Sequence, residues 1–555
     1  MEEKRPWTRH YDYNVPLAIR YPHWTTPDLF QLPANQNPDH TALNFFGTEM
    51  TFWHLRSRIL AMANALARLG IKKGERVGIH LPTSPQYIIS FFAVTALGAV
   101  VVNLNPMYTN QELKNLASET GMTTIITFDR VLPTIRDLVR EVPFDRVVVT
   151  AVTDFVEGMP LSTARSLELA KGWHHFSALL EECPDTKRPR VEISPQDPAV
   201  LQFTGGTTGI PKGAVLTHSN IIAGTFQCAL WGNATMGNIP IERRSVLGVL
   251  PFFHVYGLIV VMCWALFNSA TQILVPRFEL EEMMDLLGRF EEISFFPTVP
   301  TMINAIVNHP RAEELELGKR LGVLNSGAAP ISVELIEHIK DMGIFFAEGW
   351  GMSETTSLGI SSPQLGLKKP GSIGIPFPDT DVRLVDVENG IHDVKKGDPG
   401  EILIRSPLVM AGYWNNPEAT ARELENGWLH TGDIAVQDED DYFFIVDRKK
   451  DLIIAGGFNV YPREVDEVLY QHPKIADAVT IGIPDEYRGE TIKSFVVLKP
   501  GETADSEEII GFSREKLAAY KAPKFIEFRE SLPKSAVGKI LRKVLRAEEE
   551  KKEKS

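Results

Sequence analysis

The hydrophobic positions in the first 150 residues alternate between helical spacing and short β-branched runs. Residues 51–70 carry an apolar side chain every three or four positions and end at a glycine, which predicts an amphipathic helix. A strand over 75–81, a helix over 85–98 and a strand over 99–103 follow. Further helices are expected over 111–119 and 131–142, with strands over 123–127 and 146–149. Such alternation is typical of βαβ units and predicts largely parallel sheets.

The pattern changes further along the chain. Residues 152–195 are polar and poorly patterned, and we interpret them as surface connections. Alternation of helix and strand returns near Ala199 and continues to about Gly374. Short strands separated by turns then predict a small β-rich subdomain. Its strands are expected over 381–387, 400–405 and 442–446.

A compact unit with both helices and strands is predicted after Arg448. Its strands are expected over 452–454, 476–483, 494–498 and 525–528, and its helices over 462–471 and 506–517. We place the domain boundary at 447–450, which divides the chain into residues 1–447 and 448–555. Residues 547–555 are almost all charged, and we expect this tail to fray.

Length and charge limit the classes of function. A chain of 555 residues is too long for one hydrophobic core and fits a large domain with a smaller one. Its formal net charge is −14, and no cluster of basic residues is large enough to suggest binding to a phosphate backbone. Nucleic acid is therefore not an expected partner, because binding to a phosphate backbone needs a basic surface.

The cysteines and apolar runs bear on the compartment. Three scattered cysteines are too few for a disulfide framework, and we expect buried thiols in a reducing cytosol. The polar residues 1–14 do not have the pattern of a secretory signal. Apolar runs over 87–102 and 255–267 are shorter than the roughly 20 residues that span a bilayer. We therefore predict a cytoplasmic protein whose membrane contact is at most peripheral.

The segment 204–213 reads Thr-Gly-Gly-Thr-Thr-Gly-Ile-Pro-Lys-Gly and is the first strong chemical signal. Its glycines let backbone N–H groups turn inward, while its threonine hydroxyls and Lys212 add donors and positive charge. Together they predict an anion nest for a polyphosphate. The order Pro-Lys-Gly excludes a Walker A loop, which needs Gly-Lys-Ser/Thr. An ordinary structural turn is the alternative.

This loop resembles the signature loop of the acyl-adenylate-forming superfamily, which includes acyl-CoA synthetases, beetle luciferases and peptide-synthetase adenylation domains. Gly205 stands where relatives usually have serine or threonine. Segment 325–330 resembles the family's adenine-pocket turn, and segment 348–355, Glu-Gly-Trp-Gly-Met-Ser-Glu-Thr, is more specific. The resemblance implies that Trp350 stacks on adenine and that Glu354 holds Mg²⁺. Taken singly, Trp350 could be a core aromatic residue and Glu354 a solvated acid at a helix start.

The C-terminal half continues the resemblance in the family's order. Asp433 matches the acid that accepts hydrogen bonds from both ribose hydroxyls, which suits an acceptor-only carboxylate. Segment 447–451 resembles the hinge motif, in which Arg448 contacts the nucleotide and Lys450 is the pivot. Segment 455–464 resembles the loop along the pantetheine channel, and segment 533–540 the motif that carries the adenylation lysine, here Lys539.

The resemblance thus assigns a full set of sites. ATP binding falls to Thr204, Gly205, Gly206, Thr207, Thr208, Gly209, Lys212, Gly327, Ala328, Ala329, Glu348, Gly349, Trp350, Gly351, Met352, Ser353, Glu354, Asp433, Arg448 and Lys539. Catalytic roles fall to Lys539, Glu354, His254, Lys450 and Gly457, coenzyme A to Gly456, Gly457 and Phe458, and the metal to Thr207 and Glu354. A buried core histidine is the alternative for His254.

The implied fold class is α/β: a large N-terminal domain of parallel-rich αβ-layered subdomains plus a small β-rich subdomain, followed by a small mobile α+β C-terminal domain. The implied reaction uses ATP, Mg²⁺ and coenzyme A. A carboxylate attacks the α-phosphorus of ATP to give acyl-AMP and pyrophosphate, and the coenzyme A thiolate then displaces AMP. Because the attacking carboxylate and ATP are both anions, catalysis is expected to consist mainly of charge neutralisation and alignment. A homodimer is also predicted.

The substrate is predicted to be a medium- or long-chain fatty acid. No aspartate lies near the strand around 246–250, where amino-acid-activating relatives hold an amine. Phe252, Phe253, Tyr256 and Leu258 either line an acyl tunnel or belong to the core. Alternatives are an aromatic-acid ligase, an acyl-AMP ligase that serves a carrier protein, a luciferase-type oxygenase and a catalytically silent binding protein. Joint retention of Glu354, Asp433, Arg448 and Lys539 argues against the last.

Overall fold

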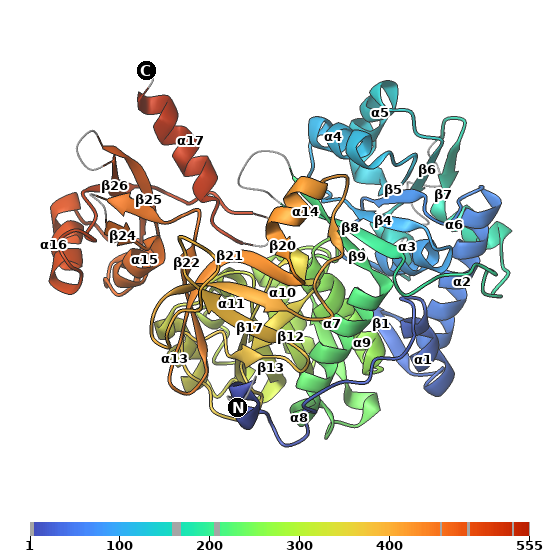
Figure 1. Cartoon of the computed structure of the whole chain (residues 1–555). Coiled ribbons are helices and arrows are strands. Elements are labelled where there is room, and N and C mark those ends of the chain that lie inside the picture. The colour runs from blue at the N-terminus through green and yellow to red at the C-terminus, as the bar shows by residue number, and fades with distance from the viewer. Residues whose placement is uncertain are drawn as a thin grey trace.

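Two parallel-rich sheets, built mostly from the first 360 residues, form the larger part of the computed structural model (Figure 1). Side chains from both sheets contribute to one hydrophobic cluster. The structure describes residues 5–157, 168–204, 211–455, 458–485, 489–535 and 538–553. The first sheet has the strand order β16 (Ile375–Pro376), β15 (Leu358–Ser361), β14 (Phe346–Gly351), β13 (Leu321–Ser326), β12 (Ile293–Thr298), β10 (Ser245–Gly248), β11 (Thr271–Leu274), β1 (Thr41–Phe45) and β2 (Thr48–Thr51). From β1 to β14 the neighbours in this order are parallel. The predicted parallel character is confirmed.

The second sheet carries the N-terminal βαβ units. Its order is β19 (Gly412–Tyr413), β9 (Lys212–Thr217), β8 (Pro198–Thr204), β4 (Val100–Asn103), β3 (Arg76–Ile79), β5 (Thr124–Phe128), β6 (Arg146–Thr150) and β7 (Trp173–His175). Strands β8, β4, β3, β5, β6 and β7 run parallel to one another, whereas β9 pairs antiparallel with β8 and with β19. The antiparallel β8–β9 pair brackets the predicted phosphate loop.

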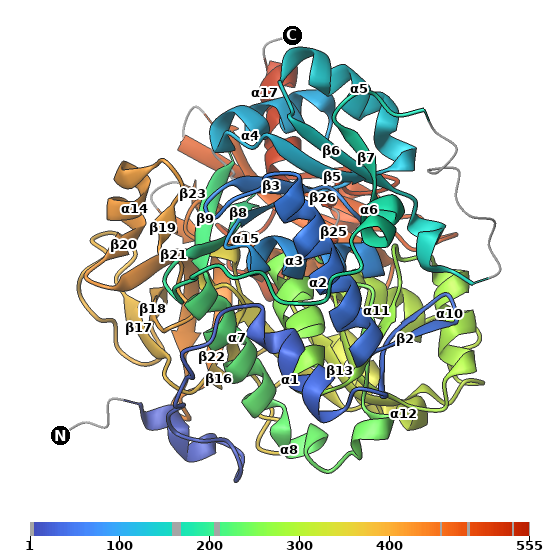
Figure 2. The same ribbon diagram turned by 90° about the vertical axis from the view of Figure 1, so that its right-hand side faces the viewer.

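The helices cover these two sheets. Helices α2 (Phe52–Arg68) and α3 (Pro85–Ala96) pack against each other in the shared core (Figure 2). Every side chain of α3 is buried, which explains why its sequence is apolar on all faces rather than on one stripe. The other helices of this part include α1 (Asp28–Gln36), α4 (Asn110–Thr120), α5 (Leu132–Glu141), α6 (Phe176–Glu182), α7 (His218–Trp231), α8 (Asn233–Met236), η5 (Tyr256–Cys263), α9 (Trp264–Phe267), α10 (Leu280–Arg289), α11 (Pro300–Val307), α12 (Leu317–Arg320), α13 (Val333–Asp341) and η6 (Ser353–Thr355).

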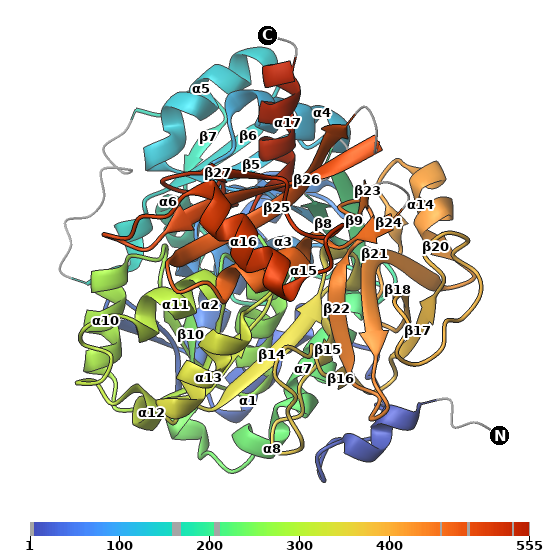
Figure 3. The ribbon, with the colours of Figure 1, turned by 90° about the vertical axis from the view of Figure 1, so that its left-hand side faces the viewer.

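Two smaller sheets follow. The first has the order β17 (Asp381–Val385), β18 (Gly400–Arg405), β21 (Trp428–Gln437) and β20 (Leu424–Glu425), with β22 (Phe443–Arg448) on β21 and α14 (Pro417–Glu423) beside it. The second has the order β24 (Phe458–Val460), β23 (Ile453–Ala455), β26 (Gly489–Leu498) and β25 (Ile475–Asp485), with β27 (Phe525–Phe528) on β26. Figure 3 shows α15 (Pro462–Tyr470) and α16 (Ser506–Lys516) in front of this second small sheet. This second small sheet and its helices have two hydrophobic clusters of their own.

Two predictions about irregular segments are wrong. Residues 152–195 are not only surface connections, because β7 extends the parallel sheet beside β6 and α6 packs Phe176 and Leu180 into the core. The tail is predicted to fray from residue 547, but residues 547–553 belong to the helix α17 (Arg542–Glu553). Glu549 forms an ion pair with Lys493 of β26, and Glu548 forms one with Arg529, which follows β27. These charged residues therefore hold the helix against the sheet.

The described cysteines are buried, as predicted, and burial raises the pKa of the Cys228 thiol to about 12. Within the described ranges, each helix is too short or too polar to cross a membrane.

Candidate functional site

The predicted phosphate loop connects two strands that the structure describes. Gly205, Gly206, Thr207, Thr208 and Gly209 lie outside the described residues, as do Gly456 and Gly457 of the predicted coenzyme A loop. Thr204 ends β8 and pairs in register with Lys212, which begins β9. The loop therefore starts and ends at one edge of the second sheet.

Lys212 belongs to a polar chain that reaches Glu354. Its ammonium forms an ion pair with Glu423 at the end of α14 and lies 4.9 Å from the ring centroid of Tyr413. The Tyr413 hydroxyl lies 2.6 Å from Glu423 Oε2 and 3.0 Å from Glu354 Oε1. Sequence reasoning missed Tyr413 and Glu423. The aromatic residue in the turn sequence Ala-Gly-Tyr-Trp-Asn-Asn was the available signal, but only the pairing of β19 with β9 reveals its neighbours.

Glu354 is a buried carboxylate and not a solvated acid at a helix start. It lies in η6 and is 6% exposed. Burial raises the pKa of Glu354, and burial together with the negative charge of Glu354 raises the pKa of the Tyr413 hydroxyl. A buried carboxylate oxygen is a ligand that Mg²⁺ accepts, and Mg²⁺ is often held by one or two carboxylates plus phosphate oxygens. Glu354 could supply one such oxygen, and among the described residues no group of three acidic, histidine or cysteine side chains could hold a metal ion.

Trp350 near the end of β14, Asp433 in the middle of β21 and Arg448 at the end of β22 meet at one point. The Trp350 indole N–H donates to Asp433 Oδ2 at 2.8 Å, and Arg448 Nε lies 3.0 Å from Asp433 Oδ1. Asp433 and Arg448 are direct partners in the β21–β22 register. Trp350 is 8% exposed and belongs to the edge of the shared core, so the core interpretation also describes it. The carboxylate thus lies beside a flat aromatic ring and a guanidinium, a combination suited to a nucleoside.

The predicted adenine turn is held in an unusual backbone conformation. It follows β13, and Ala328 has a φ of 66°, which a residue with a Cβ rarely adopts. A Cβ on Gly327 would lie 3.1 Å from the Tyr256 ring, whose hydroxyl donates to Asn325 Oδ1 at 2.6 Å. Ala329 completes the small-residue surface of this turn.

Strand β14, which pairs with β13, carries the first part of the predicted ATP segment 348–355 close to this turn. A Cβ on Gly351 would lie 2.2 Å from the Ser357 carbonyl, so this close approach requires glycine. Gly349 also packs tightly, against Leu358. Burial raises the pKa of Glu348 to about 8, opposed by the charge of Arg463. The remaining predicted residues of this segment, Met352 and Ser353, follow the strand at η6.

Lys539 reaches the same region from the C-terminal part of the chain. Burial lowers its pKa to about 7, helped by the charges of Arg448 and Lys450 and opposed by that of Asp433. The neighbouring Gly538 is packed so closely that a Cβ there would lie 2.4 Å from Thr301 Oγ1 in α11. The backbone at Gly538 therefore packs closely on α11, and Lys539 lies near enough to Asp433 and Arg448 for their charges to act on its ammonium.

Lys450 lies within reach of the charges of Arg448 and Asp433, whereas the pKa of His254 is shifted by burial alone. Burial lowers the pKa of Lys450 to about 8, and the charge of Arg448 lowers it further. Burial lowers the pKa of His254 to about 4, which leaves its imidazole neutral at pH 7. His254 packs at 4.7 Å between ring centroids on Phe253, immediately before η5.

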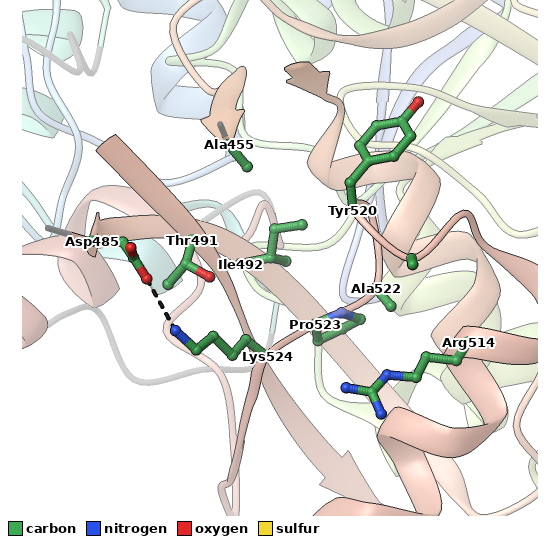
Figure 4. A pocket seen from close by; sticks show the side chains of 10 residues that line it. Ala455, Asp485, Thr491, Ile492, Arg514, Tyr520, Ala522, Pro523 and Lys524 are labelled. Atoms are coloured by element: carbon green, nitrogen blue, oxygen red, sulfur yellow. Dashed lines mark hydrogen bonds and ion pairs between the residues drawn. The ribbon is translucent and has the colours of Figure 1, made fainter. Parts of the chain in front are cut away.

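A cavity lies beside the predicted coenzyme A loop. It has a volume of ≈ 320 Å³, and Ala455, Tyr520 and Lys524 are among its lining residues (Figure 4). The ring of Phe458 packs against that of Tyr520, with centroids 4.7 Å apart. A second, narrow apolar space lies between α7, η5 and the first sheet, with Trp231, Val260 and Trp264 in its wall.

The fold and the site together define an adenylate-forming enzyme, and the chain belongs to the AMP-binding enzyme family. Residues 30–414 match the AMP-binding enzyme domain, and residues 464–539 match the AMP-binding enzyme C-terminal domain. The chain is 39% identical over 560 residues to the long-chain-fatty-acid–CoA ligase of Bacillus subtilis (strain 168), with 99% of each chain covered. It is 34% identical over 511 residues to the feruloyl-CoA synthase of Amycolatopsis sp, with 92% of this chain and 96% of the synthase covered. The crystal structure of the anthranilate CoA ligase AuaEII in complex with anthranoyl-AMP is similar with a TM-score of 0.86 and 27% identity, over 98% and 99% of the two chains.

Proposed function

We propose that this protein is an ATP-dependent fatty acyl-CoA ligase that acts on medium- or long-chain acids. It forms acyl-AMP and pyrophosphate and then transfers the acyl group to coenzyme A with release of AMP. The observation that carries the proposal is the convergence of Lys539, Arg448 and Asp433 beside Trp350, together with the buried Glu354 nearby. The near full-length similarity to long-chain-fatty-acid–CoA ligases supports the acyl substrate.

In this proposal the described residues divide the work of the first half-reaction. Trp350 and Asp433 hold the adenosine, and Lys212 holds the leaving pyrophosphate. Lys539 places its positive charge between the attacking carboxylate and the α-phosphate, where negative charge accumulates. Glu354 and Thr207 would hold Mg²⁺, which would supply positive charge against the polyphosphate. Neutral His254 lies beside the acyl carboxylate, where a second cation would compete with Lys539.

The second half-reaction requires a different arrangement of the C-terminal unit. We place the hinge at 447–450 and the pivot at Lys450, so that rotation removes Lys539 and presents the loop of Gly456, Gly457 and Phe458 to the thioester site. One contact across this hinge must then break, because Asp447 Oδ2 accepts the backbone N–H of Arg463, in the first turn of α15, at 2.7 Å.

The substrate proposal is tested by AMP release with ATP, Mg²⁺ and coenzyme A across acetate, octanoate, palmitate, benzoate and 4-coumarate. We expect the maximum at octanoate or palmitate. A maximum at an aromatic acid would keep the adenylation chemistry and replace the fatty acid by an aromatic one. Absence of turnover with all five, with acyl-AMP still formed, would favour a carrier protein as acceptor.

The coenzyme A assignment predicts a selective effect of Phe458→Ala. Because Phe458 packs on Tyr520 at the rim of the cavity, its loss should raise KM for coenzyme A by about 10-fold, the effect of losing one packed aromatic contact. Pyrophosphate release in the first half-reaction should stay unchanged. Phe528→Ala, an exposed aromatic residue of β27, is the matched control. Equal losses in both half-reactions would contradict the assignment.

The cytoplasmic location, the at most peripheral membrane contact and the homodimer predicted from the sequence also belong to this proposal. Size-exclusion chromatography with light scattering tests the homodimer, and sedimentation with lipid vesicles tests the membrane contact.

A further inference from the structure

The polar chain from Lys212 to Glu354 contains an acid with no place in the reaction described above. Glu423 is the last residue of α14, and its carboxylate bonds to Lys212 through Oε1 and to the Tyr413 hydroxyl through Oε2. The side chains of Lys212 and Glu423 are 23% and 26% exposed. The pair is therefore partly shielded from water, and its attraction is stronger than that of a fully exposed pair.

Tyr413 links this ion pair to Glu354. A hydroxyl carries one hydrogen, so Tyr413 can donate to only one of the two carboxylates at a time. The shorter distance, 2.6 Å against 3.0 Å, favours donation to Glu423. The Tyr413 ring also lies beneath the Lys212 ammonium, which keeps the lysine on the same side of β9 as Glu423.

We propose that Glu423 is a positioning residue that holds Lys212 while no nucleotide is bound and yields it to the terminal phosphates of ATP. The inference rests on the proposed function, in which Lys212 holds those phosphates and the pyrophosphate that leaves. The carboxylate is a built-in competitor for the lysine. It lowers the affinity for ATP and pyrophosphate and draws Lys212 back when pyrophosphate departs.

The residues around Glu423 keep the free-energy cost of breaking its ion pair with Lys212 small. When Lys212 turns to a phosphate, Glu423 keeps the hydrogen bond from the Tyr413 hydroxyl. It also keeps its ion pair with Arg422, whose guanidinium lies 3.6 Å from Oε1. Breaking a shielded ion pair usually destabilises a protein because one charge is left without a partner. Here the Glu423 carboxylate still has partners after Lys212 leaves. A polyphosphate carries several negative charges against one on Glu423, so charge-assisted bonds favour the phosphate.

Glu423→Gln tests the proposal, because glutamine keeps the size and an oxygen for Tyr413 but removes the competing charge. Isothermal titration calorimetry with magnesium pyrophosphate and magnesium ATP should show binding tighter by about 3- to 10-fold, with slower pyrophosphate release. Glu425→Gln, an exposed acid two residues further on in β20, is the matched control and should bind like the wild type. In a Lys212→Ala background the Glu423→Gln effect should disappear.

Unchanged or weaker binding by Glu423→Gln would overturn the proposal, since a merely structural role would not give a gain in affinity. Thermal unfolding checks that the variant is folded. Should it not fold, Glu423→Asp answers the same question, because a shorter carboxylate reaches Lys212 less well and should give a smaller gain in the same direction. A wild-type protein that does not bind magnesium ATP would instead contradict the proposed function itself.

Discussion

Replacement of Lys539 by alanine is expected to lower acyl-AMP formation by about 10³-fold, the upper end of what loss of one preorganised charge at a reacting centre costs. Thioester formation from supplied acyl-AMP should stay within about twofold of the wild type, because the lysine acts only in the first half-reaction. The structural reason is that Gly538 packs closely on Thr301 of α11, which leaves Lys539 buried within reach of the charges of Arg448 and Asp433. Pyrophosphate release measures the first step, and the consumption of free thiol with synthetic acyl-AMP measures the second.

The matched control for this prediction is Lys543→Ala. Lys543 is an exposed lysine four residues further on in α17, so its loss removes one positive charge from the same segment without touching the site. It should change neither half-reaction. Equal losses of both half-reactions in Lys539→Ala would contradict a role limited to adenylation and would indicate that the lysine holds the nucleotide throughout.

Asp433→Ala is expected to raise KM for ATP by about 100-fold. The carboxylate would lose its bonds to the ribose and would also release two neighbours, Trp350 at 2.8 Å and Arg448 at 3.0 Å, that it holds in place. Loss of a charged hydrogen-bonding group in a buried site costs about 2–3 kcal/mol, which corresponds to this change in affinity. Initial rates of pyrophosphate release at varied ATP concentration measure KM, and an ATP titration by calorimetry measures the matching loss of affinity.

Two further variants sharpen the Asp433 prediction. Asp433→Asn keeps the shape and an acceptor oxygen but lacks the charge that pairs with Arg448, so its loss should be intermediate. Asp440→Asn, an exposed acid paired with Lys369 in the turn after β21, is the control and should leave KM for ATP unchanged. An Asp433→Ala variant with normal KM and a lower kcat would show that the carboxylate acts on the chemical step and not on nucleotide binding.

The regular elements could be predicted from the chain because their signals are local. Helix α2 has an apolar residue every three or four positions and begins at Thr51, whose side chain accepts a hydrogen bond from the His54 backbone N–H. Helix α4 has the same kind of start, a capping box between Thr109 and Glu112. In both, the physical cause lies within a few residues of the element and is therefore visible in sequence.

The two segments that were predicted wrongly have causes that lie far away in the chain. Strand β7 has only three residues and no strong alternation, and it is a strand because β6 offers it an edge. Helix α17 is stabilised by Lys493 and Arg529, which are 56 and 19 residues from their partners Glu549 and Glu548. Local propensity gives little information about such elements, because their stability comes from contacts between distant residues.

The sequence by itself determined the family, the order of the motifs and the residue types that the chemistry needs, because those are written in short segments such as 204–213 and 348–355. Only the tertiary structure decided that Glu354 is buried, that Asp433 holds Trp350 and Arg448 together, and that Lys539 reaches them from more than 90 residues away. It alone placed Tyr413 and Glu423 between Lys212 and Glu354. The physical reason is that burial, pairing and pKa depend on distances through space, and the pairing of β19 with β9 sets these distances over almost 200 residues of chain.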